Sequence, residues 1–292
     1  MTIDSHQHFW RYDRAEYGWI DDSMARLQRN FLPEDVIDQM ARTGIDASIA
    51  VQARQSLEET RWLLELADAN PFIAGVIGWV DLQAENPREQ LETFAPASKL
   101  VGVRHIVQAE ADDRFLLTPA FCRGISMLED LELAYDILIF PRHLDVAAEF
   151  VSRFPRQRFV IDHLAKPNIR QGELKEWERG FRALAEFPHV FCKVSGLVTE
   201  ADWTRWTPDQ LRPYLDVAFD AFGAQRLIAG SDWPVCTMAG DYSRTMSVLT
   251  HYLSGRPESE RVAVMGGTAQ RCWNLNADGR PGRRQYQTGE LV

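Results

Sequence analysis

Eight short runs rich in valine, isoleucine and phenylalanine recur along the chain, and segments with helical patterns separate them. Several runs are almost uniformly apolar, as expected of strands that are covered on both faces. Repeated strand–helix units predict a parallel sheet, and eight of them predict an α/β fold of the (β/α)8 TIM-barrel type. The runs are Thr2–His8, Ala47–Ala53, Phe72–Val80, Leu100–Val107, Ala134–Phe140, Arg158–His163, Val190–Gly196 and Arg226–Asp232.

Signals at the helix ends support this alternation. Ser56-Leu-Glu-Glu59 has the pattern of a capping box, Thr207-Pro-Asp-Gln210 adds proline at the first helical position, and Gly44 is expected to end a helix. A doubly wound open sheet is the alternative fold. Such sheets usually have a glycine-rich phosphate-binding turn after the first strand, and Ser5-His-Gln-His8 is unlike one.

The length of 292 residues exceeds the ~250 typical of one barrel, and we expect a single catalytic domain at residues 1–275. Residues 276–292 mix glycine, proline, arginine and polar residues without periodicity, so they are expected to form a surface tail. Residues 9–32 form an unusually long connection after the first strand. Because this connection contains Trp10, Tyr12, Tyr17 and Trp19, we expect it to be ordered over a site.

The charge of the chain limits its partners. Lysine and arginine total 32 while aspartate and glutamate total 42, and the net charge of −10 disfavours nucleic acid, whose phosphates require a basic surface. No stretch approaches the ~18 apolar residues of a membrane span, and the first residues lack the features of a signal peptide. We therefore expect a cytoplasmic protein with a small-molecule partner and with neither nucleic acid nor membrane.

Titratable residues gather where the predicted strands end, which is the end of a barrel that carries catalytic groups. His6 and His8 leave one face of the first strand about 6.5–7 Å apart, so their imidazoles can converge. Other strand ends carry similar groups, namely Arg104 and His105, Asp162 and His163, and Asp232. Such a set could bind a divalent ion or position water. The alternatives are histidines satisfied by backbone carbonyls and an Asp232 that only forms a turn before Trp233-Pro234.

Cations also follow two of the predicted strands. Arg54 comes after the second run and Lys166 after the sixth, and at a barrel mouth they suggest a polar substrate atom such as a developing oxyanion. Such side chains also cap helices, so this interpretation stays open. Asp162 is expected to orient a neighbouring ligand, and Lys193, inside the seventh run, to be structural.

Four strand-end motifs are Ile3-Asp-Ser-His-Gln-His8-Phe-Trp10, Gly102-Val-Arg-His105, Ile161-Asp-His-Leu-Ala-Lys-Pro167 and Gly230-Ser-Asp-Trp-Pro234. Together they resemble the amidohydrolase superfamily, and within it the branch of sugar-lactone and pyrone-dicarboxylate lactonases. The helical ending Gly266–Arg271 is similar to the final helix of that family. The resemblance covers residues 1–275, and the four motifs are specific in combination although each alone is not.

The resemblance implies roles for matching residues. His6 and His8 match a first-strand metal-binding pair, and His163 matches a sixth-strand histidine. Asp232 matches an aspartate that activates water. The four are expected to be catalytic and to hold a metal if one is bound. The fifth run departs from the metal-dependent pattern, because His143 lies three residues late. The lactonase branch is thought to need no tightly held metal, so the chain is expected to require no cofactor, or to bind one zinc ion without a clear catalytic role.

The reaction implied is hydrolysis of a sugar-acid lactone. A general base accelerates a reaction by ~10²–10⁴-fold and an oxyanion donor by ~10²–10³-fold. Together these accelerations suffice to hydrolyse a strained ester but are small for the hydrolysis of an amide. The expected substrate is a 1,5- or 1,4-lactone of a six-carbon aldonic acid, such as the 6-deoxy acids related to L-fucose or L-rhamnose. The predicted substrate contacts are Trp10, Trp19, Arg54, Arg104, His105, Lys166 and Trp233.

Two other functions stay open. One is a metal-dependent hydrolase or decarboxylase of a small aromatic or pyrone carboxylate, which should have more arginines at the mouth than Arg54, Arg104 and Arg142. The other is a barrel that binds a sugar acid without turnover. Asp232 disfavours that function, since an unpaired carboxylate would repel an acidic ligand.

Overall fold

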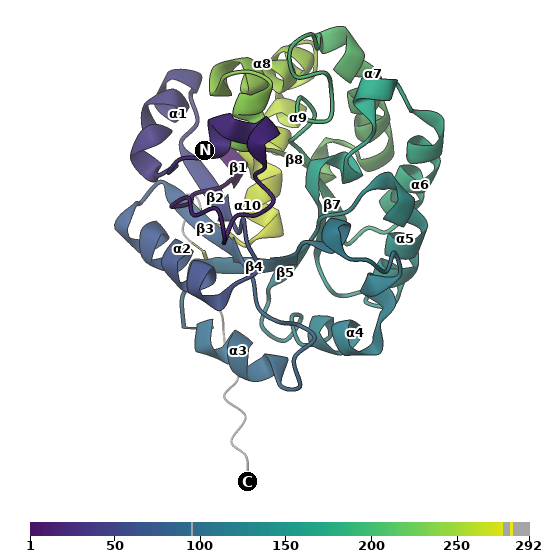
Figure 1. Ribbon diagram of the computed structural model, residues 1–292. Helices are drawn as coiled ribbons and strands as arrows, with labels where there is room; N and C mark the ends of the chain where they lie inside the picture. The colour runs from purple at the N-terminus through teal and green to yellow at the C-terminus, as the bar shows by residue number, and fades with distance from the viewer. Residues whose placement is uncertain (95, 277–280, 283–292) are drawn as a thin grey trace.

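The computed structural model describes residues 1–94, 96–276 and 281–282. Eight parallel strands form one sheet in the order of the chain, with the helices outside it, so the predicted barrel is confirmed (Figure 1). Each strand lies within the run that predicted it. The strands are β1 (Ile3–Gln7), β2 (Ala47–Val51), β3 (Ile73–Gly78), β4 (Leu100–His105), β5 (Ala134–Ile137), β6 (Phe159–Ile161), β7 (Val190–Val194) and β8 (Leu227–Ala229).

The helices begin and end largely at the predicted signals. Thr207 and Gln210 form the expected capping box, and a helix ends at Gly44, whose φ is 70°. Ser56 Oγ accepts a hydrogen bond from Glu59 N at 3.0 Å, but the Glu59 carboxylate does not return to Ser56. The α-helices of the described residues are α1 (Ile37–Thr43), α2 (Leu57–Ala69), α3 (Pro87–Phe94), α4 (Pro119–Ile125), α5 (Leu144–Ser152), α6 (Lys175–Ala185), α7 (Pro208–Phe222), α8 (Tyr242–Leu253), α9 (Glu258–Val262) and α10 (Thr268–Cys272). None of them has the length and apolar character needed to cross a membrane.

The barrel closes between β8 and β1 through a side chain and the segment that follows β8. The Asp4 carboxylate accepts a hydrogen bond from Ser231 N at 2.8 Å. Three residues after β8, Asp232 N donates to His6 O of β1 at 2.9 Å. This seam therefore sets Asp232 directly beside His6.

The amino-terminal end of the barrel is covered by the segment around α10. Trp273 is buried among strand residues that include Ile3 and Ile228. Gly266 packs against the backbone of Met1 so closely that a side chain would not fit there. The predicted tail at 276–292 lies outside the described residues except for 276, 281 and 282, and the domain boundary stays a prediction.

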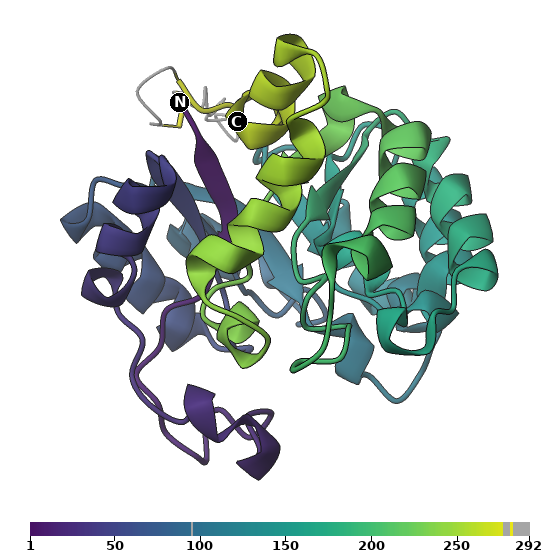
Figure 2. The ribbon, with the colours of Figure 1, turned by 90° about the horizontal axis from the view of Figure 1, so that it is seen from above.

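Residues 9–32, called the first loop below, extend from the carboxyl end of β1 on the side opposite the N-terminus (Figure 2). Trp10 and Phe31 form an isolated antiparallel bridge at its base, with two backbone hydrogen bonds of 2.9 Å. Arg26 Nη1 donates to Thr237 O at 2.8 Å in the segment after β8. The loop thus folds back onto the mouth of the barrel.

Candidate active site

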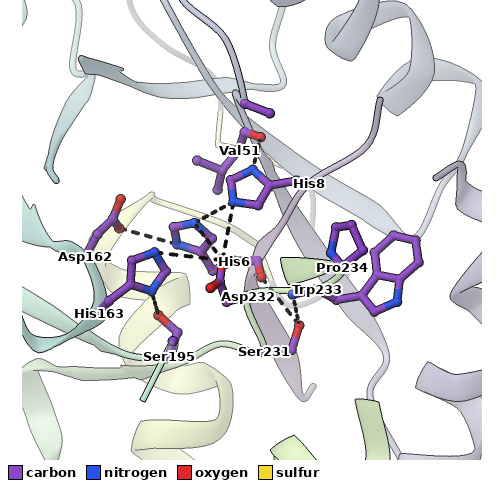
Figure 3. A network of polar contacts seen from close by, with 12 residues as sticks. His6, His8, Val51, Asp162, His163, Ser195, Ser231, Asp232, Trp233 and Pro234 are labelled. Atoms are coloured by element: carbon purple, nitrogen blue, oxygen red, sulfur yellow. Dashed lines mark hydrogen bonds and ion pairs between the residues drawn. The ribbon is translucent and has the colours of Figure 1, made fainter. Parts of the chain in front are cut away.

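The carboxyl ends of β1, β6 and β8 bring three imidazoles and one carboxylate together (Figure 3). Asp232 Oδ1 lies 3.9 Å from His6 Nε2, 3.4 Å from His8 Nε2 and 3.8 Å from His163 Nε2. The Nε2 atoms of His6 and His8 are 3.2 Å apart. All four side chains are buried. The predicted convergence of these residues is therefore present in the fold.

Each imidazole is held through its other ring nitrogen. The Nδ1 neighbours are Val51 O for His8 at 2.8 Å and Ser195 Oγ for His163 at 2.9 Å, while His6 Nδ1 has both Lys193 Nζ at 3.3 Å and Asp162 Oδ1 at 3.4 Å. A carbonyl can only accept a hydrogen bond, so His8 Nδ1 carries a proton, and His8 Nε2 faces Asp232. Metal-ligating histidines are usually oriented in this way.

His6, His8 and Asp232 fit a divalent metal ion. Zinc binds nitrogen and oxygen at about 2.0–2.2 Å, so a tetrahedral site needs ligand atoms about 3.3–3.6 Å apart. The observed separations within this trio are 3.2, 3.4 and 3.9 Å. An ionised carboxylate and imidazole lone pairs at these distances repel one another unless a proton or a cation lies between them.

His163 and Asp162 form a second group that could hold an ion together with His6. The fifth strand contributes no ligand to either group. His143 Nε2 lies 3.0 Å from Asp113 Oδ1, and its Nδ1 accepts a hydrogen bond from Phe140 N at 3.1 Å. The fifth strand therefore departs from the metal-dependent pattern in the structure as it does in the sequence.

Burial sets the protonation of the cluster. It lowers the pKa of His163 to about 4 and holds the pKa of His6 well below its ordinary value, so both imidazoles are neutral at pH 7. Burial alone would raise the pKa of Asp232, but His163, His8 and Lys166 outweigh it and lower that pKa. The cluster therefore combines an ionised carboxylate with the neutral imidazoles of His6 and His163, which are the forms that accept protons or bind metals.

A second buried cluster of charged side chains lies next to His6, and we call it the charge quartet. It consists of Arg104, Asp136, Asp162 and Lys193, all at most 3% exposed. Lys193 Nζ lies 3.0 Å from Asp162 Oδ1 and also contacts Asp136 Oδ2, while Arg104 Nη1 lies 2.9 Å from Asp162 Oδ2. Two cations thus face two carboxylates, and burial raises the pKa of Asp136 to about 7. The sequence did not predict that Asp136 would lie beside Lys193.

Arg104 and His105 are adjacent on β4, so their side chains point to opposite sides of the sheet. Arg104 Nη1 lies 3.3 Å from His6 Nε2. His105 instead stacks on Phe115, with ring centroids 4.7 Å apart, and its Nε2 lies 2.7 Å from Glu110 Oε1. Of the two predicted contacts, Arg104 reaches the histidine cluster in this arrangement.

Lys166 lies near the cluster together with an acidic partner that the sequence analysis missed. Its Nζ is 3.5 Å from Glu200 Oε1. Burial raises the pKa of Glu200, Lys166 lowers it and the charge of Asp232 raises it further. No motif or spacing around Glu200 indicates this position, because the loop after β7 brings it there.

The predicted aromatic contacts differ in exposure. Trp10 and Trp233 are fully buried, and Trp10 Nε1 donates to Arg29 O at 2.9 Å. Trp233 packs against Phe31, with ring centroids 5.4 Å apart. Trp19 is 39% exposed. In this conformation Trp10 and Trp233 support the first loop from within, and their contact with a substrate stays a prediction.

The backbone after β6 is strained. His163, Leu164, Ala165 and Lys166 all have φ between 52° and 56°, the left-handed region, where each such residue costs roughly 1–2 kcal/mol. Strain of this kind gathers at functional sites. Gly196, with φ +66°, makes room for His163, since a Cβ there would lie 2.5 Å from His163 Nδ1.

Comparisons with known proteins agree with this geometry. Residues 3–275 match the model of the amidohydrolase family. An L-fucono-1,5-lactonase of Burkholderia multivorans is 43% identical over 94% of this chain and 96% of its own length, and one of Burkholderia ambifaria is 40% identical over 83% of each. A crystal structure of a Burkholderia multivorans amidohydrolase with bound zinc superposes with a TM-score of 0.92 at 43% identity, over 94% of this chain and all of that one. This chain belongs to the amidohydrolase family.

Proposed function

We propose that this protein hydrolyses the lactone of a sugar acid, with Asp232 as the base that activates water. The observation that carries the proposal is the ionised Asp232 carboxylate, buried beside the neutral imidazoles of His6 and His163 at the barrel mouth. The similarity to two enzymes named L-fucono-1,5-lactonase supports the reaction class and favours a 1,5-lactone of a 6-deoxy sugar acid.

In the proposed mechanism, Asp232 takes a proton from a water molecule as its oxygen attacks the lactone carbonyl. The carbonyl oxygen gains negative charge in the tetrahedral intermediate, and Lys166 and Arg104 stabilise it. The intermediate collapses when the bond between the carbonyl carbon and the ring oxygen breaks. Protonated Asp232 returns the proton to the departing hydroxyl, and the open-chain sugar acid leaves. His105 has no part in these steps, because it faces the opposite side of β4.

His6, His8 and Asp232, with His163 beside them, would hold a divalent ion such as the zinc of the Burkholderia multivorans structure. When bound, such an ion polarises a carbonyl or lowers the pKa of water. We propose that turnover does not depend on it, since Asp232 supplies the base and Lys166 and Arg104 supply positive charge.

The charges around the mouth favour an uncharged lactone over a carboxylate substrate. Every cation that the sequence analysis placed near the mouth has an acidic partner among the described residues: Arg54 pairs with Glu16, Arg104 with Asp162, Arg142 with Asp113 and Lys166 with Glu200. A substrate with additional carboxylates would have to compete with these partners. This argues against an aromatic or pyrone carboxylate as the substrate.

Proton release from a panel of aldonolactones tests the proposal. Asp232→Asn keeps the shape of the side chain but removes its basicity, so kcat should fall by ~10²–10⁴-fold while KM changes little. Asp145→Asn is the matched control, because Asp145 is an exposed carboxylate on α5 that pairs with the exposed Arg179, and it should retain the parent kcat. Near-parent turnover by Asp232→Asn would show that another group is the base. A parent that hydrolyses no lactone of the panel would favour a binding protein.

A further inference from the structure

The Glu59 carboxylate has an unexpected position. It lies on the first turn of α2 and is 1% exposed, although Ser56 already caps this helix. Its Oε2 accepts hydrogen bonds from Ala53 N and Arg54 N, each at 2.9 Å, in the turn between β2 and α2. Its Oε1 accepts a hydrogen bond from the Tyr17 hydroxyl at 3.1 Å. A carboxylate is costly to bury, so these three bonds indicate a task beyond helix capping.

The first loop contacts the turn between β2 and α2 at two further points. Trp19 Nε1 donates to Ala53 O at 3.0 Å. The Arg54 guanidinium pairs with Glu16 and lies 5.6 Å from the centre of the Tyr17 ring. Tyr17 joins both sets of contacts, because its hydroxyl is bound by Glu59 and its ring faces Arg54.

This attachment continues to the histidine cluster through aromatic rings. The centroids of Tyr17 and Trp10 are 5.9 Å apart, and those of Trp10 and His8 are 6.4 Å apart. Trp19 also packs against Trp10, with centroids 5.8 Å apart. A displacement of Tyr17 would therefore move both the partly exposed Trp19 and the packing next to His8.

We propose that Glu59 is a positioning residue that fastens the first loop to the turn between β2 and α2 and so holds Trp19 at the rim of the substrate site. The proposal deepens the lactonase function and rests on it for the identity of the substrate. Glu59 acts through Tyr17 and the backbone of residues 53–54 and does not contact the lactone.

Hydrogen–deuterium exchange of the first loop tests the fastening without any substrate. Tyr17→Phe removes only the hydrogen bond between the Tyr17 hydroxyl and the Glu59 carboxylate. Glu59→Ala removes the acceptor both for that hydroxyl and for the backbone N–H groups of residues 53 and 54. Each should speed exchange in residues 9–32 by about 10–100-fold. Glu59→Gln keeps an acceptor for the backbone N–H groups and an amide that can donate to the Tyr17 oxygen, so it should restore slow exchange. Glu58→Gln, an exposed neighbour on the same turn, is the matched control.

Kinetics with an aldonolactone test the consequence for the site. Tyr17→Phe should raise KM roughly tenfold and change kcat by less than about threefold, since Trp19 binds substrate and Asp232 is untouched. Exchange at the parent rate in Tyr17→Phe would overturn the proposal. Faster exchange with an unchanged KM would overturn it as well, because the loop would then be fastened without serving the site. A parent without lactonase activity would refute the proposed function, and the exchange arm would still decide whether Glu59 fastens the loop.

Discussion

The charge quartet makes a strong prediction about stability. Lys193→Met keeps the length of the side chain but leaves Asp136 and Asp162 with Arg104 as their remaining cation. Breaking a buried ion pair by removing one partner costs about 3–5 kcal/mol, because a charge stays buried without compensation. In a domain of this size 1 kcal/mol shifts Tm by about 2–4 °C, so Tm should fall by roughly 6–20 °C.

The double variant Lys193→Met/Asp136→Asn distinguishes charge balance from simple loss of contacts. It leaves one positive and one negative charge, Arg104 and Asp162, and should recover more than half of the lost stability. Thermal and urea unfolding followed by circular dichroism measure both variants, with the exposed Lys175→Met as control. A double variant less stable than Lys193→Met, or a single variant within about 1 kcal/mol of the parent, would refute the reasoning.

Three further predictions concern the metal, the backbone and pH. A chelator should leave most of the lactonase activity, because the proposed base and cations are protein groups; complete loss that zinc restores would contradict this. Gly196→Ala should lower kcat at least about tenfold, since its Cβ would displace His163, and should destabilise the fold by about 1–2 kcal/mol; unchanged kinetics would contradict it. Burial raises the pKa of Glu59 from 4.5 to about 7, so the stability that protonated Glu59 contributes is present at low pH and is lost as pH rises toward 7. The stability difference between the parent and Glu59→Gln should therefore fall by roughly 2 kcal/mol from pH 5 to pH 7.5, and a constant difference in urea unfolding would be inconsistent with this.

The fold and the histidine cluster could be predicted from sequence because both follow from local patterns. Apolar runs mark the strands, and the barrel then brings His6, His8 and Asp232 to one end regardless of the loops between them. Interior pairings such as Lys193 with Asp136 could not be predicted, because they depend on the register between strands. The direction of His105 depends on a shift of one residue, which an apolar run does not fix.

The bonds of Glu59 also escaped prediction, for a different reason. Its sequence context matches a capping box, and the local signal is correct for Ser56. The carboxylate instead accepts a hydrogen bond from the hydroxyl of Tyr17, which is 42 positions away in the sequence. Local rules describe the helix end correctly and say nothing about which distant groups compete for the same side chain.

Because the site is built across the seam between β8 and β1, enzyme activity reports whether the barrel has closed. His6 lies on β1 and Asp232 follows β8, and they meet only when this junction forms through the Asp4–Ser231 bond. Closing a flexible segment of more than two hundred residues costs about 5 kcal/mol of chain entropy, so this junction is expected to form late. During refolding, far-ultraviolet circular dichroism should therefore recover before catalysis does. The interval between the two signals would report how long the barrel persists as an open, inactive sheet.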